Sequence, residues 1–495
     1  MKIVLSCLLC ISPFVSAQTM IDAQQSLFDQ QLLKTDGRIR HLTLEQVTND
    51  ESLEIVVYAR KGSFPNWVGT LHVFEQDTSG SKLALHSKVN IPAETIYYGF
   101  LLMQGQSYLL LVMPDKVSVV PYKAGNWLLK QGKDFPLQSL TEPWAKSTAI
   151  PFQPVLAVDG EQQVWIPTAT GYQVFKISGN ELLQESFVAL SPKSFYRSSY
   201  DLLPFEMSYW FQNVFWYPQM FPGTLGGEKQ VLFSPWMDEL DIVIPSQGYA
   251  VDKHYFRILS EQERDDGTHY LINQPIDLNG DGLTDFLINK FQGVGTSFRS
   301  ESYYYMANKD GKLPKKKKLV PFSKKKISGA LVRDLTGNGK QDFLIVSSVL
   351  NVWSMIRALT KKQVLVSFDI HLLLDQQSDY NFKQANATRE ILFDFSLKDF
   401  FIDGILPTLQ GDFNGDGYPD VMYATNPREL TFLLQKPGKE EVFSAIPSGL
   451  YPINLAKKYR IGDVTGDGKA DIVFFDTRSS KNHSFKALLN NGVLK

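Results

Sequence analysis

The chain has 495 residues, of which 43% are hydrophobic, and a formal net charge of −2 at pH 7. This near-neutral balance gives no argument for a nucleic-acid partner, and no segment after the N-terminus is apolar for long enough to span a membrane. The length suggests several domains, but a single closed array of repeats can also reach this size.

Residues 1–17 have the three parts of a secretory signal peptide. Lys2 precedes an apolar run over residues 3–15, and small residues follow up to Ala17. Cleavage after Ala17 would leave residues 18–495 with 49 basic and 52 acidic side chains, a formal charge of −3, and no cysteine, because both cysteines lie inside the segment. We therefore expect an exported protein, periplasmic or extracellular, that has no disulfide bonds.

Residues 18–270 contain short apolar runs of β-strand type, each preceded by a polar turn. The first run covers residues 55–58, and others begin near residues 108, 164 and 231. The turns before them are irregular: residues 46–54 keep acidic side chains at their fifth and ninth positions, whereas residues 105–107 have none. We interpret these units as worn copies of a repeat that is regular in the C-terminal half.

Residues 195–221 are unusually aromatic, and flat rings with a polar tip suit sugar stacking or a protein interface. Packing between repeats is the alternative, since it also uses large side chains. If the chain has a ligand surface, we expect it to include Tyr196, Arg197, Tyr200, Tyr209, Trp210 and Trp216.

A nine-residue pattern recurs four times in residues 271–495, at 277–285, 334–342, 412–420 and 463–471. Oxygen-bearing side chains stand at positions 1, 3, 5 and 9, and glycine always stands at position 6, where it permits a tight turn. Calcium takes six to eight oxygen ligands, which alternate residues and a position-7 carbonyl can supply. The sequence predicts three to four Ca²⁺ sites built from Asp277, Asn279, Asp281, Leu283, Asp285, Asp334, Thr336, Asn338, Lys340, Asp342, Asp412, Asn414, Asp416, Tyr418, Asp420, Asp463, Thr465, Asp467, Lys469 and Asp471.

The four loops differ in charge. Loop 334–342 offers two carboxylates, because Asn338 stands where the other loops have an aspartate, and each of the others offers three. We expect loop 334–342 to bind calcium most weakly.

An EF-hand is excluded, because it needs a glutamate at position 12 and a following helix. Position 12 is Ile288, Ile345, Tyr423 or Phe474. The residues after each loop form short runs that are apolar at successive positions, which favours strands covered on both faces.

Two basic runs, residues 315–318 and 324–326, lie between the first two loops. They could bind an anionic partner, but lysines that protect an edge strand are the preferred interpretation. Residues 349–359 carry apolar side chains at helical spacing, which predicts a short amphipathic helix inserted over a blade edge.

The loops recur at intervals of roughly 50–80 residues, which is typical of propellers and other repeat architectures. On these loops and the runs that follow them, residues 270–480 resemble the FG-GAP/VCBS repeat family, whose integrin alpha-chain relatives form calcium-decorated β-propellers. The resemblance implies that each loop joins two strands of a blade and that a cation rigidifies it.

Candidate blades begin near residues 46, 105, 159, 227, 277, 334, 412 and 463. They predict an all-β propeller over residues 18–495 with eight four-stranded blades, or seven if two weak units merge. Because the last unit is short, we expect a strand near residues 26–33 to complete it and close the ring.

The resemblance implies a non-catalytic calcium-binding module for a protein or glycan partner, as in cell adhesion. A structural subunit of an envelope assembly is one alternative. Another is a polysaccharide lyase, since some lyases use His and Tyr on propellers, and here His254, Tyr255 and Arg257 form the one cluster suited to proton abstraction. The chain has neither G-x-S-x-G nor H-E-x-x-H, so we do not expect an enzyme.

Overall fold

The structure, a computed structural model, describes residues 26–494 with gaps. The gaps are residues 51, 63–65, 78–81, 141–149, 191–218, 227–229, 267–268, 293–298, 311, 314–315, 322–325, 350–351, 375–378, 397–400, 437–441, 444–445, 455–457 and 478–481. Residues 1–17 and the six candidate ligand residues between 196 and 216 therefore lie outside the described part of the chain.

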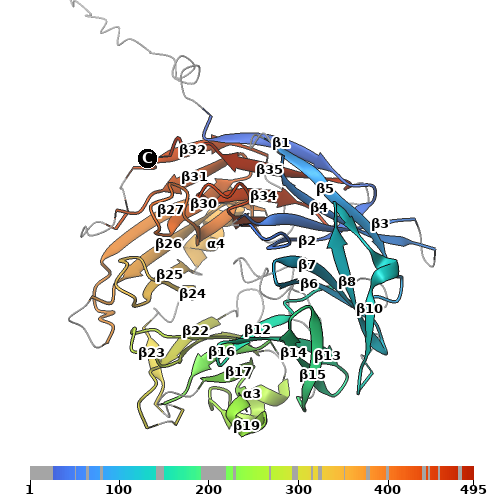
Figure 1. Ribbon diagram of the computed structural model, residues 1–495. Helices are drawn as coiled ribbons and strands as arrows, with labels where there is room; N and C mark the ends of the chain where they lie inside the picture. The colour runs from blue at the N-terminus through green and yellow to red at the C-terminus, as the bar shows by residue number, and fades with distance from the viewer. Residues whose placement is uncertain are drawn as a thin grey trace, which may run out of the picture.

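Eight antiparallel four-stranded blades form a β-propeller around a central axis (Figure 1). Blade 1 consists of β33 (Lys458–Gly462), β34 (Asp471–Phe475), β35 (Ser484–Asn490) and β1 (Phe28–Lys34). Blade 2 consists of β2 (Arg38–Glu45), β3 (Glu54–Lys61), β4 (Val68–Gln76) and β5 (Leu83–Ile91). Blade 3 consists of β6 (Tyr97–Met103), β7 (Gln106–Val112), β8 (Lys116–Lys123) and β10 (Lys133–Pro136), with β9 (Asn126–Trp127) and β11 (Ile150–Pro151) as short additions. Blade 4 consists of β12 (Val155–Val158), β13 (Glu161–Thr168), β14 (Gly171–Ser178) and β15 (Glu181–Val188).

The second half of the ring repeats this arrangement. Blade 5 consists of β16 (Phe221–Thr224), β17 (Gln230–Trp236), β18 (Glu239–Ile244) and β19 (Ala250–Tyr255). Blade 6 consists of β20 (His269–Ile276), β21 (Asp285–Gln292), β22 (Arg299–Tyr305) and β23 (Lys318–Val320). Blade 7 consists of β24 (Lys326–Arg333), β25 (Asp342–Val349), β26 (Gln363–His371) and β27 (Ala387–Ser396), with the short β28 (Phe401–Ile402). Blade 8 consists of β29 (Ile405–Gly411), β30 (Asp420–Asn426), β31 (Glu429–Leu433) and β32 (Gly449–Pro452).

The core lies between the blades. In the blades that carry a nine-residue loop, the second strand is buried along its length, as β21 and β34 show, because its apolar side chains contact a neighbouring blade on either face. Aromatic side chains fill these interfaces: the ring centroids of Phe233 in blade 5 and Phe286 in blade 6 are 5.2 Å apart at an edge-to-face angle. The expectation of strands covered on both faces is confirmed.

The N-terminal strand closes the ring. Strand β1 pairs antiparallel with β35, with Phe28 opposite Asn490 and Lys34 opposite Ser484. Phe28 is buried against Phe432 and Tyr451 of blade 8. The predicted completion of the last unit by residues 26–33 is confirmed. The eight-blade prediction is also confirmed, since all eight predicted starting points lie between the first two strands of a blade.

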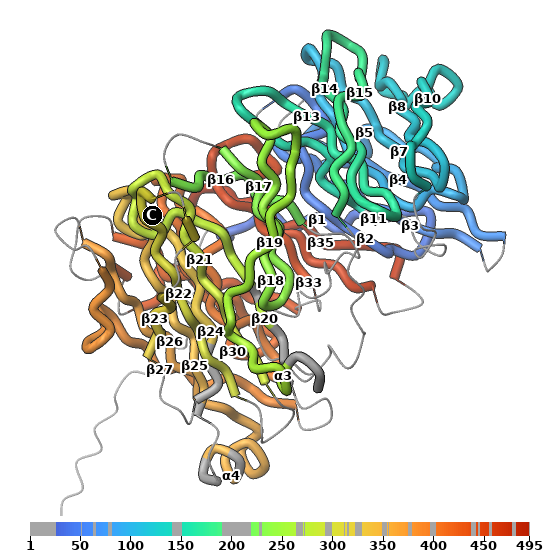
Figure 2. The backbone as a smooth tube through the Cα atoms, turned by 90° about the horizontal axis from the view of Figure 1, so that it is seen from below, coloured from blue at the N-terminus to red at the C-terminus, as the bar shows by residue number. Residues whose placement is uncertain are grey.

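Two helices and two 3₁₀ turns interrupt the strands within the described part of the chain. They are α3 (Glu261–Asp266), α4 (Val352–Lys361), η1 (Leu129–Gln131) and η4 (Pro245–Gln247). The amphipathic helix expected near residues 349–359 is α4, which contacts β26 and protrudes from one end of the ring (Figure 2). Ala358 is buried, whereas Ile356 and Leu359 are 42% and 59% exposed, so part of the apolar face of α4 is exposed.

Lys318 begins β23, the outermost strand of blade 6, as the edge-strand interpretation of the first basic run requires. No helix in the described part of the chain has the length and apolar character needed to cross a membrane.

Candidate metal centres

The four nine-residue loops occupy equivalent places in blades 6, 7, 8 and 1. Each joins the innermost strand to the second strand, and its position-9 aspartate is the first residue of that second strand. A strand rather than a helix follows every loop, so the exclusion of an EF-hand is confirmed. The loops share one end of the ring, and α4 lies at the opposite end because β25 separates it from loop 334–342.

The position-1 aspartate organises each loop. In loop 412–420, Oδ1 of Asp412 accepts the N–H of Gly415 at 2.7 Å, and Oδ2 accepts the N–H of Gly417 at 2.6 Å. The same two bonds recur from Asp277, Asp334 and Asp463. Both glycines of each loop have a positive φ, between +70° and +88°, which suits glycine and wraps the backbone around the first carboxylate.

The position-9 aspartate is fully buried and connects three parts of its blade. In loop 412–420, Oδ2 of Asp420 accepts the N–H of Phe413 at 2.7 Å, and Oδ1 accepts the N–H of Gln435 at 2.8 Å, just beyond the third strand. Asp285, Asp342 and Asp471 make corresponding pairs of bonds.

Burial raises the pKa of these position-9 carboxyls. The pKa of Asp285, Asp420 and Asp471 rises to about 7, and that of Asp342 to about 6, because burial disfavours the charged form. The other aspartates of each loop raise these pKa values further through repulsion. A cation in the loop would favour the ionised forms.

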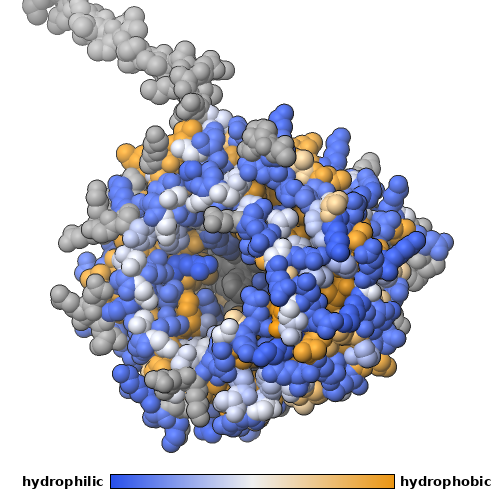
Figure 3. Space-filling model, viewed as in Figure 1, coloured by the Kyte–Doolittle hydropathy of each residue, from blue (hydrophilic) through white to orange (hydrophobic). Residues whose placement is uncertain are grey.

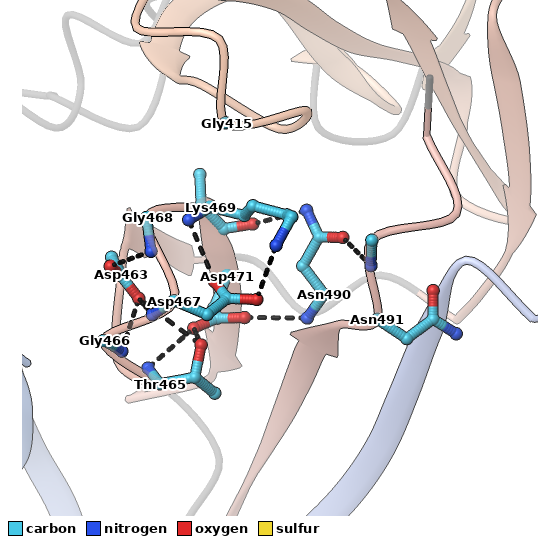
Figure 4. Close-up of polar contacts among 12 residues, drawn as sticks. Gly415, Asp463, Thr465, Gly466, Asp467, Gly468, Lys469, Asp471, Asn490 and Asn491 are labelled. Carbon is cyan, nitrogen blue, oxygen red and sulfur yellow. Dashed lines mark hydrogen bonds and ion pairs between the residues drawn. The ribbon is translucent and has the colours of Figure 1, made fainter.

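The loops differ in how their charge is balanced. In loops 277–285 and 412–420, the aspartates make no ion pair with any described residue. In loop 463–471, Nζ of Lys469 lies 2.9 Å from Oδ2 of Asp467 and partly neutralises it (Figure 4). In loop 334–342, Nδ2 of Asn338 donates to the carbonyl of Leu373 at 2.9 Å, and its Oδ1 accepts the N–H of Lys340 within the loop at 2.9 Å, so this position adds no negative charge.

The donor set suits a hard divalent cation. Among the described residues, no group of three or more Asp, Glu, His or Cys side chains is gathered into a ligand cage. Each loop nevertheless places carboxylate, amide or hydroxyl, and carbonyl oxygens within a single turn, which are the ligands that calcium takes. The uncompensated charge of loops 277–285 and 412–420 is the observation that fits calcium.

The loop of residues 46–54 in blade 2 lacks most of these oxygen ligands but keeps the position-9 carboxylate. Residues 46–54 join β2 to β3, and the buried Glu54 stands at position 9. Its Oε2 accepts the N–H of Val47 at 2.6 Å, which is the bond that position 9 makes to position 2 in the four other loops. The position-9 carboxylate therefore has a structural role that does not depend on metal.

Neighbouring loops touch one another and form a loop arc, composed of loops 277–285, 334–342, 412–420, 463–471 and 46–54 in that order. The N–H at position 8 donates to the preceding loop in three cases: Gln341 to Leu278 at 2.9 Å, Ala470 to Asp412 at 2.7 Å, and Leu53 to Asp463 at 3.0 Å. Loop 412–420 cannot do this, because its position 8 is Pro419. There the ring of Tyr418 packs over Gly337 instead.

The contact between Tyr418 and Gly337 gives a testable prediction. A Cβ at Gly337 would lie 2.6 Å from the Tyr418 ring, whereas a Cβ at Gly339 would meet open space, and both glycines have a similar positive φ of +72° and +78°. Gly337→Ala should therefore lower the free energy of unfolding by about 1–2 kcal/mol more than Gly339→Ala. Urea unfolding measures both losses; equal losses would show that the two loops do not press on each other.

The ion pair of Lys469 gives a second prediction. Its ammonium group competes with a bound cation for Asp467, so Lys469→Met should strengthen calcium binding at loop 463–471 by roughly twofold to fivefold. Lys469→Arg keeps the charge and is the matched control. Calorimetric titration of both variants checks this, and an affinity that falls in the methionine variant would contradict it.

The lyase candidates do not converge on one site. His254 and Tyr255 are adjacent residues of β19, opposite Leu240 and Glu239, so their side chains leave opposite faces of the sheet. His254 packs edge-on against Phe256, with ring centroids 5.9 Å apart, and Tyr255 is 44% exposed. Arg257 follows in a positive-φ turn.

Three features of the loops are absent from the sequence-based prediction. They are the glycine at position 4, the second bond of each position-9 carboxylate, and the contacts between loops. The position-4 glycine can be recognised in the sequence, since all four copies have it, as Gly280, Gly337, Gly415 and Gly466. The contacts between loops depend on blade geometry that spacing does not reveal.

One family model matches part of the chain. Residues 412–474 match the family model described as an FG-GAP-like repeat, and this region contains the third and fourth loops. The WD40 domain of SCAP from fission yeast is a similar solved structure, at 9% identity over 82% of this chain and 96% of that domain, with a TM-score of 0.35. At this TM-score the likeness adds nothing to the fold seen in the sheets. No curated protein matches the chain.

Proposed function

We propose that this eight-bladed propeller with an FG-GAP-like repeat is an exported, calcium-stabilised module that binds a protein or glycan partner without catalysis. The observation that carries the proposal is the loop arc, because it gathers five loops at one end of the ring, and two of them, 277–285 and 412–420, have aspartates that make no ion pair with any described residue. A propeller with such a repeat is suited to binding and interaction in general.

Calcium would be held by the loop residues themselves. The oxygens at positions 1, 3, 5 and 9 and the position-7 carbonyl of each loop would supply its ligands. Loops 277–285 and 412–420 are the strongest candidates, because their three carboxylates are not neutralised by any described side chain. The bound ion would supply positive charge that offsets the repulsion within the loop.

Export is part of the same proposal. The apolar N-terminal segment has signal-peptide character, residues 18–495 contain no cysteine, and calcium sites of modest affinity can fill outside cells, where calcium is plentiful. Export to the periplasm and export to the exterior both meet these conditions.

Partner binding can be tested with the full mature chain as bait for envelope and culture-medium fractions, in millimolar calcium and in chelator. Asp416→Ala removes one exposed loop carboxylate, and Arg428→Gln, an exposed change on the β30–β31 turn, is the control. We expect one protein or glycan to be retained in calcium and reduced with Asp416→Ala. A mature chain that retains nothing in either condition would overturn the binding function.

A further inference from the structure

Hydrophilic side chains predominate on the face of the ring seen in Figure 3, and small apolar patches lie between them. A pocket of about 320 Å³ that combines both kinds of residue lies between blades 3 and 4. Strands β6, β7, β8 and β10 with η1 supply its blade 3 side, and the β14–β15 turn with the start of β15 supplies its blade 4 side. Its volume is at the lower end of the range for small-molecule sites.

The apolar part of the pocket belongs to the packed core between the two blades. Met103, Val119 and Leu182 line it and are 2%, 5% and 4% exposed. Phe135 also lines it and packs edge-to-face against Phe175 of blade 4, with ring centroids 5.9 Å apart. These contacts hold the two sides of the pocket together, so the pocket is formed before a ligand arrives.

The pocket lies at the end of the ring that carries the loop arc. Met103 and Gln106 flank the β6–β7 turn, which joins the first two strands of blade 3 as the loops of the arc do in their own blades. Beside this turn, Oγ of Ser107 donates to the carbonyl of Val47 in loop 46–54, the last loop of the arc. A long ligand that lies along the arc would therefore reach the pocket when it arrives at blade 3.

Three polar side chains of the pocket have no hydrogen-bond partner among the described residues. They are the phenol of Tyr108 and the amides of Gln131 and Asn180, both of which are exposed at the rim. Tyr108 is only 8% exposed, and burial raises the pKa of its phenol, so the hydroxyl stays neutral and can both donate and accept. A ligand that offers several donors and acceptors would therefore satisfy groups that the protein leaves unbonded.

The charged side chains of the pocket are positive. No aspartate or glutamate stands among the described residues that line it, whereas Lys123 and Lys133 do. Lys133 pairs across the blade interface with Glu181, whose Oε1 lies 2.8 Å from its Nζ, so its charge is compensated. Lys123 makes no ion pair with any described residue and is available to a carboxylate. A cationic ligand would find no counter-charge in this lining.

We propose that the pocket between blades 3 and 4 binds a sugar unit of a glycan and prefers acidic sugars to neutral ones. A sugar ring combines apolar C–H faces, which suit the aromatic rings of Tyr108 and Phe135, with hydroxyls on its edge. The phenol of Tyr108 and the amides of Gln131 and Asn180 would exchange hydrogen bonds with those hydroxyls. The preference for acidic sugars comes from Lys123, which would pair with the carboxylate of a uronate.

This site deepens the proposed function, because it rests on partner binding and names the partner as a glycan. It uses no residue of the four nine-residue loops, which belong to blades 6, 7, 8 and 1, so saccharide binding should persist in chelator. A mature chain that retains a protein from the envelope but binds no saccharide would lose the pocket and keep the binding function. A chain that binds saccharides in chelator, with no effect of Asp416→Ala, would keep the pocket and lose the calcium-dependent part of the function.

The test is an array of oligosaccharides of matched length, one half containing uronate units and the other half neutral, probed with the full mature chain in chelator. We expect the chain to bind uronate-containing members of the array more tightly than their neutral counterparts. Calorimetric titration with the oligosaccharide that binds most tightly then measures the affinity of each variant.

Tyr108→Phe removes one hydroxyl and should weaken binding roughly threefold to tenfold, and Asn180→Ala should have a similar effect at the rim. Tyr303→Phe makes the first of these changes in blade 6 and should leave the affinity unchanged. Lys123→Gln should weaken binding of the uronate oligosaccharide by about twofold to fivefold and leave that of its neutral counterpart unchanged. Lys312→Gln makes the same change at an exposed position between β22 and β23 and is the matched control.

Weaker binding by Tyr108→Phe and Asn180→Ala, with both controls unchanged, supports the site. Three results would overturn it: no binding to any oligosaccharide, tighter binding of the neutral members, or equal affinity in the mature chain, Tyr108→Phe and Asn180→Ala. If Tyr108→Phe melts at a lower temperature than Tyr303→Phe, Asn180→Ala decides, because its side chain is exposed. A weaker affinity in that variant supports the site, and an unchanged affinity refutes it.

Discussion

Removing calcium from the full mature chain should lower its melting temperature by on the order of 10 °C. This is the largest effect that we expect from the calcium sites. At about 100-fold excess of calcium over the dissociation constant, each filled loop adds about 2.7 kcal/mol to the free energy of unfolding. Four loops acting together would add roughly 10 kcal/mol. Calcium should stabilise the folded chain because it would supply a counter-charge in loops 277–285 and 412–420. There the position-9 carboxyls are buried beside other aspartates and have no counter-charge.

Scanning calorimetry over a calcium series measures this effect, and the melting temperature should rise continuously with calcium concentration. Magnesium at the same concentration is the control, because it demands a stricter octahedral geometry and should stabilise less. A melting temperature that is the same in calcium and in chelator would refute metal binding by the loops.

Asp420→Ala should lower the free energy of unfolding even in chelator, by about 2–5 kcal/mol. The change leaves the buried N–H groups of Phe413 and Gln435 without their acceptor, whatever the metal does. In calcium the loss should be larger, because a ligand is removed as well.

Asp416→Ala is the matched comparison in the same loop. Asp416 is exposed and accepts only local bonds, from Tyr418 N–H at 2.9 Å and Asn414 Nδ2 at 2.9 Å. Its replacement should lower the melting temperature in calcium and change little in chelator. If Asp416→Ala and Asp420→Ala lowered the melting temperature equally in chelator, the position-9 carboxylate would have no separate structural role.

The sequence predicted the ring well because the repeat unit is local. Each loop is a continuous stretch that runs straight into a buried strand, so residues 277–288 alone identify loop and strand together. The worn loops could also be located, because the apolar second strand persists after the metal ligands are lost, as residues 46–58 show. Closure by β1 followed from a last blade that lacked one strand.

Long-range features could not be predicted in this way. The bond from Gln341 to Leu278 joins two blades, and the bond from Ala307 to Asp285 spans the hairpin of β21 and β22, whose register cannot be read from the sequence. The bulge at Arg40 is set by how β2 fits against β3, because periodicity does not say which residue of a strand the ladder will skip. The exposure of Ile356 and Leu359 in α4 could not be predicted either, because helical spacing shows an apolar face without showing what covers it.

The pairing of β1 with β35 has a consequence for how the chain reaches its folded state. The two strands stand at opposite ends of the described sequence, so blade 1 can be completed only after every other blade has been synthesised. Bringing such distant segments together is slow, because the entropy of closing a long loop is lost before the contact forms. Until then β35 presents an open edge that a second chain could extend. Pairing of β1 with β35 therefore closes the ring as the last step of folding. Misassembly would follow if β1 paired first with the β35 of another molecule.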